Sequence, residues 1–498
     1  MKSRSHQSLF GRAFLALLLT IGFYGLALAI AFGLLYLIYL EVAVLGRINV
    51  RLTFFALVGA VVILWAIFPR IDKFTAPGPR LTPARFPALF KEIEKIAHAT
   101  RQEMPREVYL IPDVNAFVAE RGGFMGIGSR RVMGIGLPLF HLMTVSELSS
   151  VLAHEFGHFY GGDTALGPWI YKTRAAIIRT VVSLGSTNQW LQIPFEAYAK
   201  MFLRITNAVS RQQEFTADQL AARTVGAQAT IMGLQKVHRY GLAFDSFFRQ
   251  EYIPLLEAGY RPPMLAGFDL FLKSPRISEA VNNYYTEQET QGQSDPYDTH
   301  PSLKERLAAL QGLPPGVVLD GCEAFSLLPT SVDQFEDLIL KGMVTKKEIF
   351  KNLKLIRWDE AVQYAFLPHW QKTAETYKTI LNKLTPAMLF ETAQNFQGLF
   401  ENVARIGNFL PANVQPAQVP AEKQLEVTSN LIGSALASAL DREGWKVSAN
   451  PGEVVTCIQG TKELQPFLLF SQLATRQTSA EQWQKICEEN QISDLAMA

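Results

Sequence analysis

The feature that most limits how this chain can fold is an apolar segment near its start. Residues 13–40 contain no charged side chain, and they follow a polar stretch that carries Lys2, Arg4 and Arg12. A helix that spans a bilayer needs about 20 apolar residues, whereas the apolar part of a cleaved signal peptide has only about 7–15. The segment therefore predicts a helix that stays in a membrane.

A second uncharged segment, residues 52–68, lies close behind the first. It is near the lower length limit for a membrane span, so a buried core helix is the alternative interpretation. If both segments cross, the N-terminus and everything after Pro69 lie on the same side of the bilayer. The basic residues on that side outnumber the two arginines of the link, and they are Lys2, Arg4, Arg12, Arg70, Lys73, Arg80 and Arg85. The positive-inside rule then predicts a cytoplasmic soluble part.

Overall composition limits the classes of function. The net charge of the 498 residues is only +2, which gives no electrostatic reason to expect a nucleic-acid partner. Three cysteines, Cys322, Cys457 and Cys487, are too few for a disulfide framework and too widely spaced for a metal cluster. They favour a reducing compartment for the soluble part, in agreement with the predicted orientation.

The sequence HEFGH at residues 154–158 carries the strongest chemical signal. Positions i and i+4 of a helix share a face, so His154 and His158 can bind one metal ion together. Glu155 lies about 100° further round the helix, where it can reach a water molecule in the open position of the metal. This is the geometry that a hydrolytic zinc site needs, although so short a motif can also arise by chance.

The residues around this motif predict a helix independently. Thr144 and Glu147 form a capping box, and Gly161 with Gly162 offers a left-handed stop. Apolar side chains recur at helical spacing, at Val145, Leu148, Leu152, Phe156 and Phe159. We therefore expect the motif to lie in the middle of a packed helix.

Three short segments with strand character precede this helix, at residues 107–111, 116–119 and 131–137. The glycine-rich sequence at 122–129 could suggest a phosphate-binding loop, but the Lys-Ser/Thr pair of a P-loop does not follow it, which favours a hairpin. The third strand runs into the helix, so we expect its edge beside the site, where it can bind an extended peptide as an added strand. The alternative is a strand paired on both sides.

Residues 170–209 are apolar but interrupted by charged side chains. Each charge at the centre of a bilayer costs around 2.5–3.5 kcal/mol, so further membrane spans are not expected. Helices that lie on the membrane surface or fold over the catalytic core fit this composition better.

A candidate third metal ligand follows in the sequence EFTAD at residues 214–218. Two histidines leave a zinc ion under-coordinated, and Glu214 on a separate helix can complete the site. Asp218, one helical turn later, can accept a hydrogen bond from the distal nitrogen of a ligating histidine. The alternative for this acidic pair is a solvated helix face.

Four segments together resemble the integral-membrane zinc endopeptidases that include the HtpX heat-shock proteases and the CAAX prenyl proteases. They are PREVYLIPDVNAF at 105–117, HEFGH at 154–158, EFTAD at 214–218 and THPSLKERLAAL at 299–310. The resemblance implies that His154, His158 and Glu214 bind one zinc ion, and that Glu155 is the general base. It also implies a supporting role for Asp218. For His300 it implies a gate or a stabiliser of the oxyanion, with a solvent-facing loop histidine as the alternative.

The expected fold is mainly α with a small β-sheet. It comprises a transmembrane hairpin at 1–70, a gluzincin-like zinc peptidase domain at 71–313, a helical extension at 314–424 and a small α+β module at 425–498. The later transmembrane helices common in the family are weak here, and the extension reaches far beyond the family's usual end. We expect this extension to serve docking or packing rather than chemistry.

The expected function is hydrolysis of peptide bonds in membrane or unfolded proteins, with a protein or peptide substrate and a lipid bilayer as partners. Two other classes stay open. One is a membrane-anchored chaperone or scaffold that keeps the peptidase fold without turnover. The other is a metal-dependent hydrolase of non-peptide substrates. The sequence leaves the oligomeric state open.

Overall fold

The computed structural model describes residues 2–44, 46–70, 73–123, 128–159, 167–316, 321–329, 332–343, 352–411 and 414–498, and it describes their side chains except at 2–10, 12–13 and 167–169. The chain divides into two compact units. Unit 1 comprises residues 1–242 and 281–345, and unit 2 comprises residues 243–280 and 346–498.

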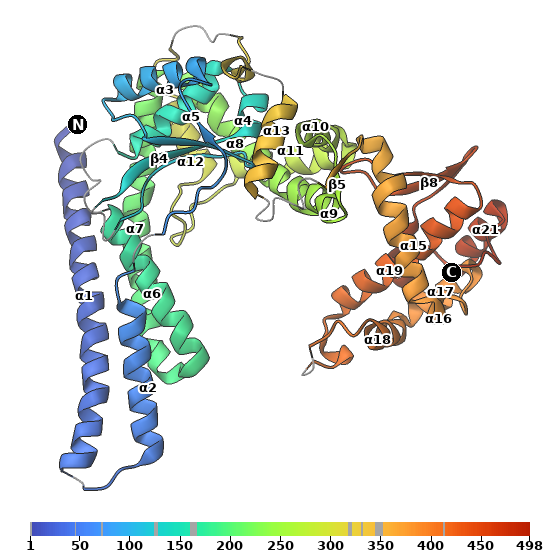
Figure 1. The fold of residues 1–498 in the computed structure, drawn as a ribbon, viewed down its shortest axis with the longest axis horizontal. Helices are drawn as coiled ribbons and strands as arrows, with labels where there is room; N and C mark the ends of the chain where they lie inside the picture. The colour runs from blue at the N-terminus through green and yellow to red at the C-terminus, as the bar shows by residue number, and fades with distance from the viewer. Residues whose placement is uncertain are drawn as a thin grey trace. The chain divides into compact units, whose positions relative to one another are not determined.

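Two long apolar helices begin unit 1, α1 (Lys2–Ala43) and α2 (Val50–Ile67), and they lie side by side (Figure 1). Residues 14–43 and 50–67 are long and apolar enough to cross a membrane, which confirms the two predicted apolar helices. Asn49 starts α2, because its side chain accepts hydrogen bonds from the backbone amides of Arg51 and Leu52. Small side chains let the two helices approach closely, and the buried ones are Ala16, Ala27, Ala31, Ala56 and Ala60.

Two further helices pack beside this pair, α6 (Gly167–Thr187) and the first half of α7 (Gln189–Thr224) (Figure 1). The four share one apolar core, to which α6 and α7 contribute Ala176, Ile177, Leu184, Phe195 and Phe202. One of our alternatives placed residues 170–209 over the catalytic core. The structure packs them against α1 and α2.

The charged residues of α6 find partners inside this bundle. Arg174 donates to the side-chain oxygen of Asn207 on α7 at 2.6 Å, and Arg179 donates to the backbone oxygen of Ala66 at 3.1 Å. These contacts explain how an interrupted apolar pattern still packs against two mainly apolar helices, because each half-buried guanidinium makes a hydrogen bond.

Four strands form the sheet of unit 1, in the order β1-β2-β4-β3. They are β1 (Arg80–Leu81), β2 (Glu107–Ile111), β3 (Ala116–Arg121) and β4 (Arg130–Gly136). β2 and β4 are parallel, with Glu107 opposite Val132, whereas β1 and β3 run antiparallel to their neighbours. The three predicted strands are confirmed, and β3 and β4 pair as the predicted hairpin. Residues 124–127 of its loop lie outside the described residues.

The predicted free edge of the third strand is wrong. β4 pairs with β2 on one side and with β3 on the other, because β3 folds back antiparallel and covers it. In the part of the chain that the structure describes, the last strand of the sheet is β3, which also contacts α5 (Val145–Gly157). The sheet edge beside the HEFGH helix is therefore the strand β3, residues 116–121.

Helices surround this sheet, with α3 and α5 packed side by side above it in the view of Figure 1. The remaining elements that lie wholly or partly in unit 1 are α3 (Pro87–Thr100), α4 (Leu137–Leu142), α8 (Ala227–Phe247), α11 (Pro275–Thr290), α12 (Leu303–Leu310), the 3-10 turn η3 (Ala324–Leu327) and α13 (Val332–Met343).

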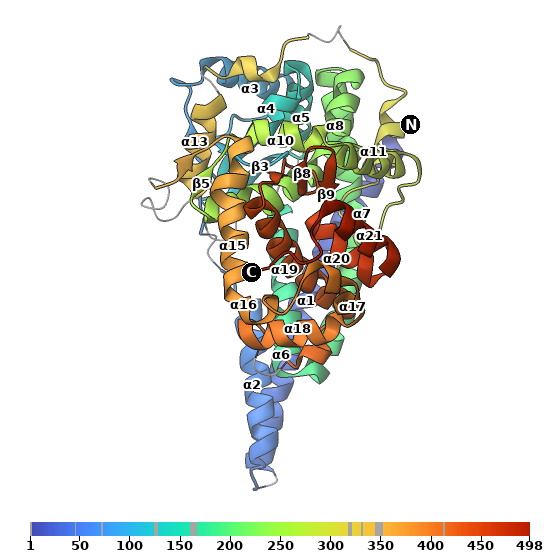
Figure 2. The same cartoon turned by 90° about the vertical axis from the view of Figure 1, so that its right-hand side faces the viewer.

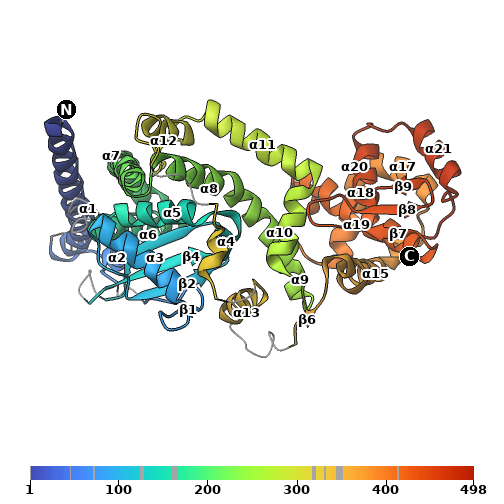
Figure 3. The ribbon, with the colours of Figure 1, turned by 90° about the horizontal axis from the view of Figure 1, so that it is seen from above.

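Unit 2 is built around α19 (Ala421–Arg442), whose side chains from Leu431 to Leu440 are all buried. Helices α15 (Leu367–Thr376) and α18 (Phe396–Gly407) pack against it (Figure 2). So do α20 (Pro466–Ala474) and the strands β7 (Lys446–Ser448) and β8 (Thr456–Gln459) (Figure 3). The serine, glycine and alanine side chains of α19 make this close packing possible.

Unit 2 also contains smaller elements. They are η2 (Phe248–Tyr252), α9 (Ile253–Glu257), β5 (Tyr260–Arg261), α10 (Met264–Lys273), β6 (Lys354–Leu355), η4 (Trp358–Glu360), η5 (Val362–Phe366), α16 (Lys378–Leu381), η6 (Pro386–Met388), α17 (Leu389–Gln394), η7 (Pro416–Gln418), β9 (Lys462–Leu464) and α21 (Ala480–Asn490). The strands β7 and β8 and the helices α19 and α21 lie where we expected an α+β module. The same segment also contains the strand β9 and the helix α20.

The grouping of residues differs from the predicted domain boundaries in two respects. Residues 243–280, which we placed in the peptidase domain, pack with the C-terminal extension because β5 pairs with β6 and α10 lies against Trp358. A Cβ atom at Gly267 of α10 would lie 2.2 Å from the indole of Trp358, and this indole donates to the backbone oxygen of Pro263 at 2.7 Å. The predicted domain boundary at residue 313 also lies inside unit 1, which includes residues 281–345.

The closest approach between α5 and α7 yields a prediction. A Cβ atom at Gly157 would lie 2.7 Å from Cα of Ala217, so Gly157→Ala must push the two helices apart. We expect a loss of about 1–3 kcal/mol of stability, seen as a lower Tm in detergent. Gly241→Ala on α8 is the matched control, because a Cβ atom there meets nothing within 4 Å. An unchanged Tm for Gly157→Ala would contradict the packing described here.

Candidate active site

The helix that carries HEFGH is fixed at its start by a capping box. The Thr144 hydroxyl accepts from the Glu147 amide, and the Glu147 carboxylate accepts from the Thr144 amide at 2.8 Å. Glu147 is fully buried, and Lys236 of α8 donates to it at 2.7 Å. The predicted N-terminus of the helix is confirmed, and a buried ion pair holds it in place.

The end of this helix differs from the prediction. α5 ends at Gly157 and His158 is its C-cap, so the motif lies in the last turn rather than in the middle. Gly161 and Gly162 lie outside the described residues. His158 keeps right-handed helical dihedral angles, φ −64° and ψ −17°, and the two imidazoles therefore still share one face.

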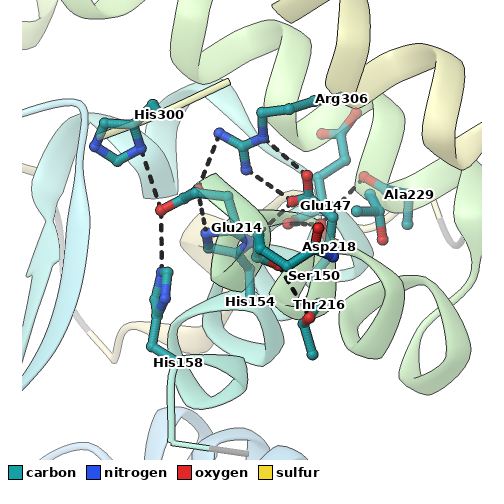
Figure 4. Close-up of polar contacts among 12 residues, drawn as sticks. Glu147, Ser150, His154, His158, Glu214, Thr216, Asp218, Ala229, His300 and Arg306 are labelled. Carbon is teal, nitrogen blue, oxygen red and sulfur yellow. Dashed lines mark hydrogen bonds and ion pairs between the residues drawn. The ribbon is translucent and has the colours of Figure 1, made fainter. Parts of the chain in front are cut away.

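Three predicted ligand residues meet between α5 and α7 (Figure 4). Nε2 of His154 lies 3.5 Å from Oε2 of Glu214, and Nε2 of His158 lies 3.6 Å from Oε1 of the same carboxylate. The two imidazole rings stand at 88° to each other with centroids 4.8 Å apart. Glu214 is 56 or more positions away from both histidines in the sequence, and the fold brings the three side chains together.

These separations fit a zinc ion. Zinc binds nitrogen and oxygen at about 2.0–2.2 Å, which places neighbouring ligands of a tetrahedral ion about 3.3–3.6 Å apart. Oε2 of Glu214 is also buried and accepts no hydrogen bond from the described residues, as expected of an oxygen shaped to hold a cation. Side-chain atoms of His154, Glu155 and His158 also lie within 4.8 Å of one another, so proximity alone does not separate the two glutamates.

Asp218 lies behind His154, as predicted. Its Oδ1 is 2.9 Å from Nδ1 of His154, although the N–H bond does not point straight at that oxygen. Arg306 of α12 donates two hydrogen bonds to the same carboxylate, from Nε to Oδ2 at 2.8 Å and from Nη2 to Oδ1 at 2.7 Å. Arg306 also comes within 3.5 Å of Glu214 Oε2, so one guanidinium holds both acidic residues.

The charged groups around His154, His158 and Glu214 favour a cation between these three side chains. Burial alone would lower the pKa of His154, but its contacts with Asp218 and Glu214 raise it to about 9. Burial alone would raise the pKa of Glu214, but contacts with His154 and His300 hold that pKa far below its usual range. Burial and the neighbouring His154 lower the pKa of His158 to about 4. Two carboxylates thus favour a proton or a metal ion at His154, whereas burial and His154 keep His158 neutral.

Glu155 occupies a different environment from Glu214. Burial raises the pKa of its carboxyl group to about 7, while a hydrogen bond from the backbone of Val118 opposes that rise. Val118 belongs to the edge strand β3, so Glu155 lies between the two histidines and the sheet. A carboxyl group with a pKa near neutrality can both accept and deliver a proton at physiological pH.

His300 lies at the mouth of the site, with its side chain 57% exposed and Nδ1 3.2 Å from Oε1 of Glu214. The contact with Glu214 raises the pKa of His300. Arg211 of α7 holds the preceding loop, because its Nη1 donates to the backbone oxygens of Asp295, Pro296 and Asp298. Although exposed, His300 is thus in contact with the carboxylate that we expect to bind metal.

A pocket of about 390 Å³ opens beside these groups. It is lined on one side by Asn115 and Ala116 next to β3, and on the other by Thr230, Leu234, Val237 and His238 of α8. Burial and the nearby Arg306 lower the pKa of His238 to about 4. Arg306 and His238 are site residues to which sequence reasoning gave no role.

A sequence signal for Arg306 existed. Leu303, Arg306, Leu307 and Leu310 share one helical face, and all four are buried. A charged residue inside an apolar stripe requires a buried partner of opposite charge, and the acidic pair at 214 and 218 was the natural candidate. His238 carried no comparable signal, because a single histidine in a helix does not by itself indicate a site.

Comparison with known proteins supports this description. Residues 83–313 match peptidase family M48. The matched segment is 231 of the 498 residues, a little under half of the chain. It contains each of the ligand and base candidates, and it begins just after the two apolar helices. A metalloprotease domain attached to membrane-type helices is the arrangement of a membrane metalloprotease.

The chain is similar to several HtpX proteases. A protease HtpX homolog from Acaryochloris marina is 26% identical over 268 residues, which cover 49% of this chain and 78% of the relative. A protease HtpX from Idiomarina loihiensis is 29% identical over 30% of this chain and 57% of its own length. A protease HtpX homolog 1 from Saccharolobus solfataricus is 31% identical over 28% of this chain and 42% of its own. No solved structure matches the chain.

The contact between Arg306 and Asp218 yields a second prediction. Arg306→Met leaves two buried carboxylates without their guanidinium, which should cost about 3–5 kcal/mol and lower the Tm. Arg306→Met combined with Asp218→Asn should lose less than the sum of the two single variants, because they share one interaction.

Arg357→Met is the matched control for this experiment. Arg357 forms an exposed ion pair with Asp359, so its loss should leave the Tm unchanged. Additive effects of the Arg306 and Asp218 substitutions would show that the two residues are not coupled.

Proposed function

We propose that this M48 peptidase is an integral-membrane zinc endopeptidase that hydrolyses peptide bonds in membrane or unfolded proteins. The observation that carries the proposal is the convergence of His154, His158 and Glu214, with nitrogen-to-oxygen separations of 3.5 and 3.6 Å. Those values match adjacent ligands of one tetrahedral ion at about 3.3–3.6 Å.

In this proposal the three residues are the zinc ligands, one ion per chain. Zinc held there would supply a Lewis acid that polarises the scissile carbonyl and lowers the pKa of a bound water molecule to about 7. Asp218 orients His154 through its distal nitrogen, and Arg306 holds Asp218 and Glu214 in place.

Glu155 acts as the general base in this proposal. It takes a proton from the attacking water and delivers it to the leaving amine. A buried carboxyl group with a pKa of about 7 suits both steps, because the energy of its two protonation states is nearly equal at neutral pH. His300, at the mouth of the pocket, can donate to the oxyanion from a position next to Glu214.

The edge strand β3 provides a binding mode for an extended substrate. Asn115 and Ala116 line the pocket, and Val118 contacts Glu155, so a peptide added to this edge would pass in front of the base. Backbone hydrogen bonds to β3 would hold many sequences in the same register. A complex with a peptide-like inhibitor bound away from β3 would exclude this mode.

Two other functions make different predictions. A chaperone or scaffold without turnover would bind unfolded protein equally well with and without a chelator. A hydrolase of non-peptide substrates would cleave an ester or amide panel and leave peptides intact. The endopeptidase proposal is favoured because the candidate base Glu155 and all three candidate ligands line the same pocket.

The role of Glu155 can be tested directly. Glu155→Gln should retain bound zinc and an unchanged Tm while cleavage of an unfolded protein falls by about 10²–10⁴-fold, because the base is lost and the ligands are not. Glu214→Ala is the comparison variant, and it should lose zinc as well as activity. Full cleavage by Glu155→Gln, or full zinc content in Glu214→Ala, would reject the assigned role.

We further propose that the catalytic part faces the cytoplasm, and the exposed Cys322 allows a test. A membrane-impermeant maleimide should label it only after cells are permeabilised, since Cys457 and Cys487 are buried. Ile48→Cys in a Cys322→Ser background is the control, because this link residue is 63% exposed and should react in intact cells. The reverse pattern would invert the orientation.

A further inference from the structure

The pocket has a second wall that the proposed chemistry does not use. Thr230, Leu234, Val237 and His238 lie on one face of α8, at positions i, i+4, i+7 and i+8. Across from them α5 contributes Ser150 and Val151, one turn before His154. Residues of α8 thus form a second wall of the pocket that also contains the candidate metal ligands.

Most polar atoms of this wall are already bonded within the protein. The Ser150 hydroxyl donates to the backbone oxygens of Glu147 and Ala229 at 2.7 and 3.2 Å. The Thr230 hydroxyl donates to the backbone oxygen of Gly226 at 3.0 Å. Both donors are thereby occupied, and they leave the surface of the wall largely apolar.

His238 is the exception. It lines the pocket, and its side chain makes no hydrogen bond or ion pair with any residue that the structure describes. The ring is half-buried, and a substrate side chain that enters the pocket displaces water from it. An imidazole that then stays unpaired costs about 1–3 kcal/mol. A bound molecule is the partner that this position allows.

We propose that His238 is a specificity-determining residue, and that the α8 side of the pocket binds a substrate side chain with an apolar stem and an uncharged hydrogen-bonding tip, such as tyrosine or glutamine. This assignment rests on the proposed endopeptidase function. Val151, Leu234 and Val237 contact the stem, and the His238 ring offers one donor and one acceptor to the tip.

Charge excludes other side chains from this subsite. The guanidinium of Arg306 is bound to Asp218, and the carboxylate of Glu214 faces the histidines and His300, so neither charge is free to pair with a substrate. A charged tip would lose its hydration against an apolar wall without gaining a counter-ion. A purely apolar side chain would fit but leave His238 unpaired.

Paired peptides can test this subsite. At each position around the scissile bond, peptides that carry tyrosine are compared with peptides that carry phenylalanine, which differs only by the hydroxyl. At one position, kcat/KM of the wild-type enzyme should be about three- to tenfold higher for the tyrosine peptide than for the phenylalanine peptide. This ratio corresponds to the usual contribution of one neutral hydrogen bond. His238→Leu should lower this ratio to about one, and His238→Asn should keep part of it because the amide still donates.

The ratio of two kcat/KM values does not depend on how much enzyme is folded or loaded with metal. A purely structural role for His238 would change both values and leave the ratio unaltered. His369→Leu is the control, because that histidine is exposed in unit 2. Wild-type cleavage with no preference at any position, or an unchanged preference in His238→Leu, would overturn the assignment. Absence of chelator-sensitive cleavage of every peptide would instead reject the endopeptidase function itself.

Discussion

Unit 1 depends on two carboxylates that α7 places in a buried position, one helical turn apart. Glu214 and Asp218 are 5% and 2% exposed, so each would be costly to ionise without partners. Arg306 and His154 supply those partners from two other elements, α12 and α5. Because a buried charge needs its counter-charges at fixed positions, this arrangement ties three helices together and orients the candidate metal ligands at the same time.

Much of this site could be predicted from residue spacing. The capping box at Thr144 and the shared face of His154 and His158 follow from helical geometry alone, and the structure has both. The acidic pair could be assigned to the same site only because two histidines require further ligands. Local rules identified the residues, and the chemistry of zinc linked segments that are far apart in sequence.

Other features depend on tertiary structure that no local pattern records. α5 ends at Gly157, where the contact with Ala217 leaves no space for a Cβ atom, and this contact is not visible in the sequence. The edge position of β3 depends on how the hairpin folds back, and strand character alone does not decide it. His238 becomes a site residue only because α8 packs against α5 at Ser150.

One helix connects most of these features. α7 has 36 residues and is therefore about 54 Å long, from the apolar bundle to the site. At one end, Tyr198 donates to the backbone oxygen of Leu19 on α1 at 2.7 Å. Near the other end lie Glu214 and Asp218, while Asn207 and Arg211 bind the backbone of the loop before His300.

A shift of α7 along α5 would therefore move three functional groups together: the candidate third ligand, the residue behind His154 and the loop at the mouth of the pocket. Gly157 and Ala217 set the distance between the two helices, so the geometry of the site is fixed by a helix contact rather than by flexible loops. The same helix is anchored against α1, which makes the apolar bundle part of the support for the site as well as a candidate membrane anchor.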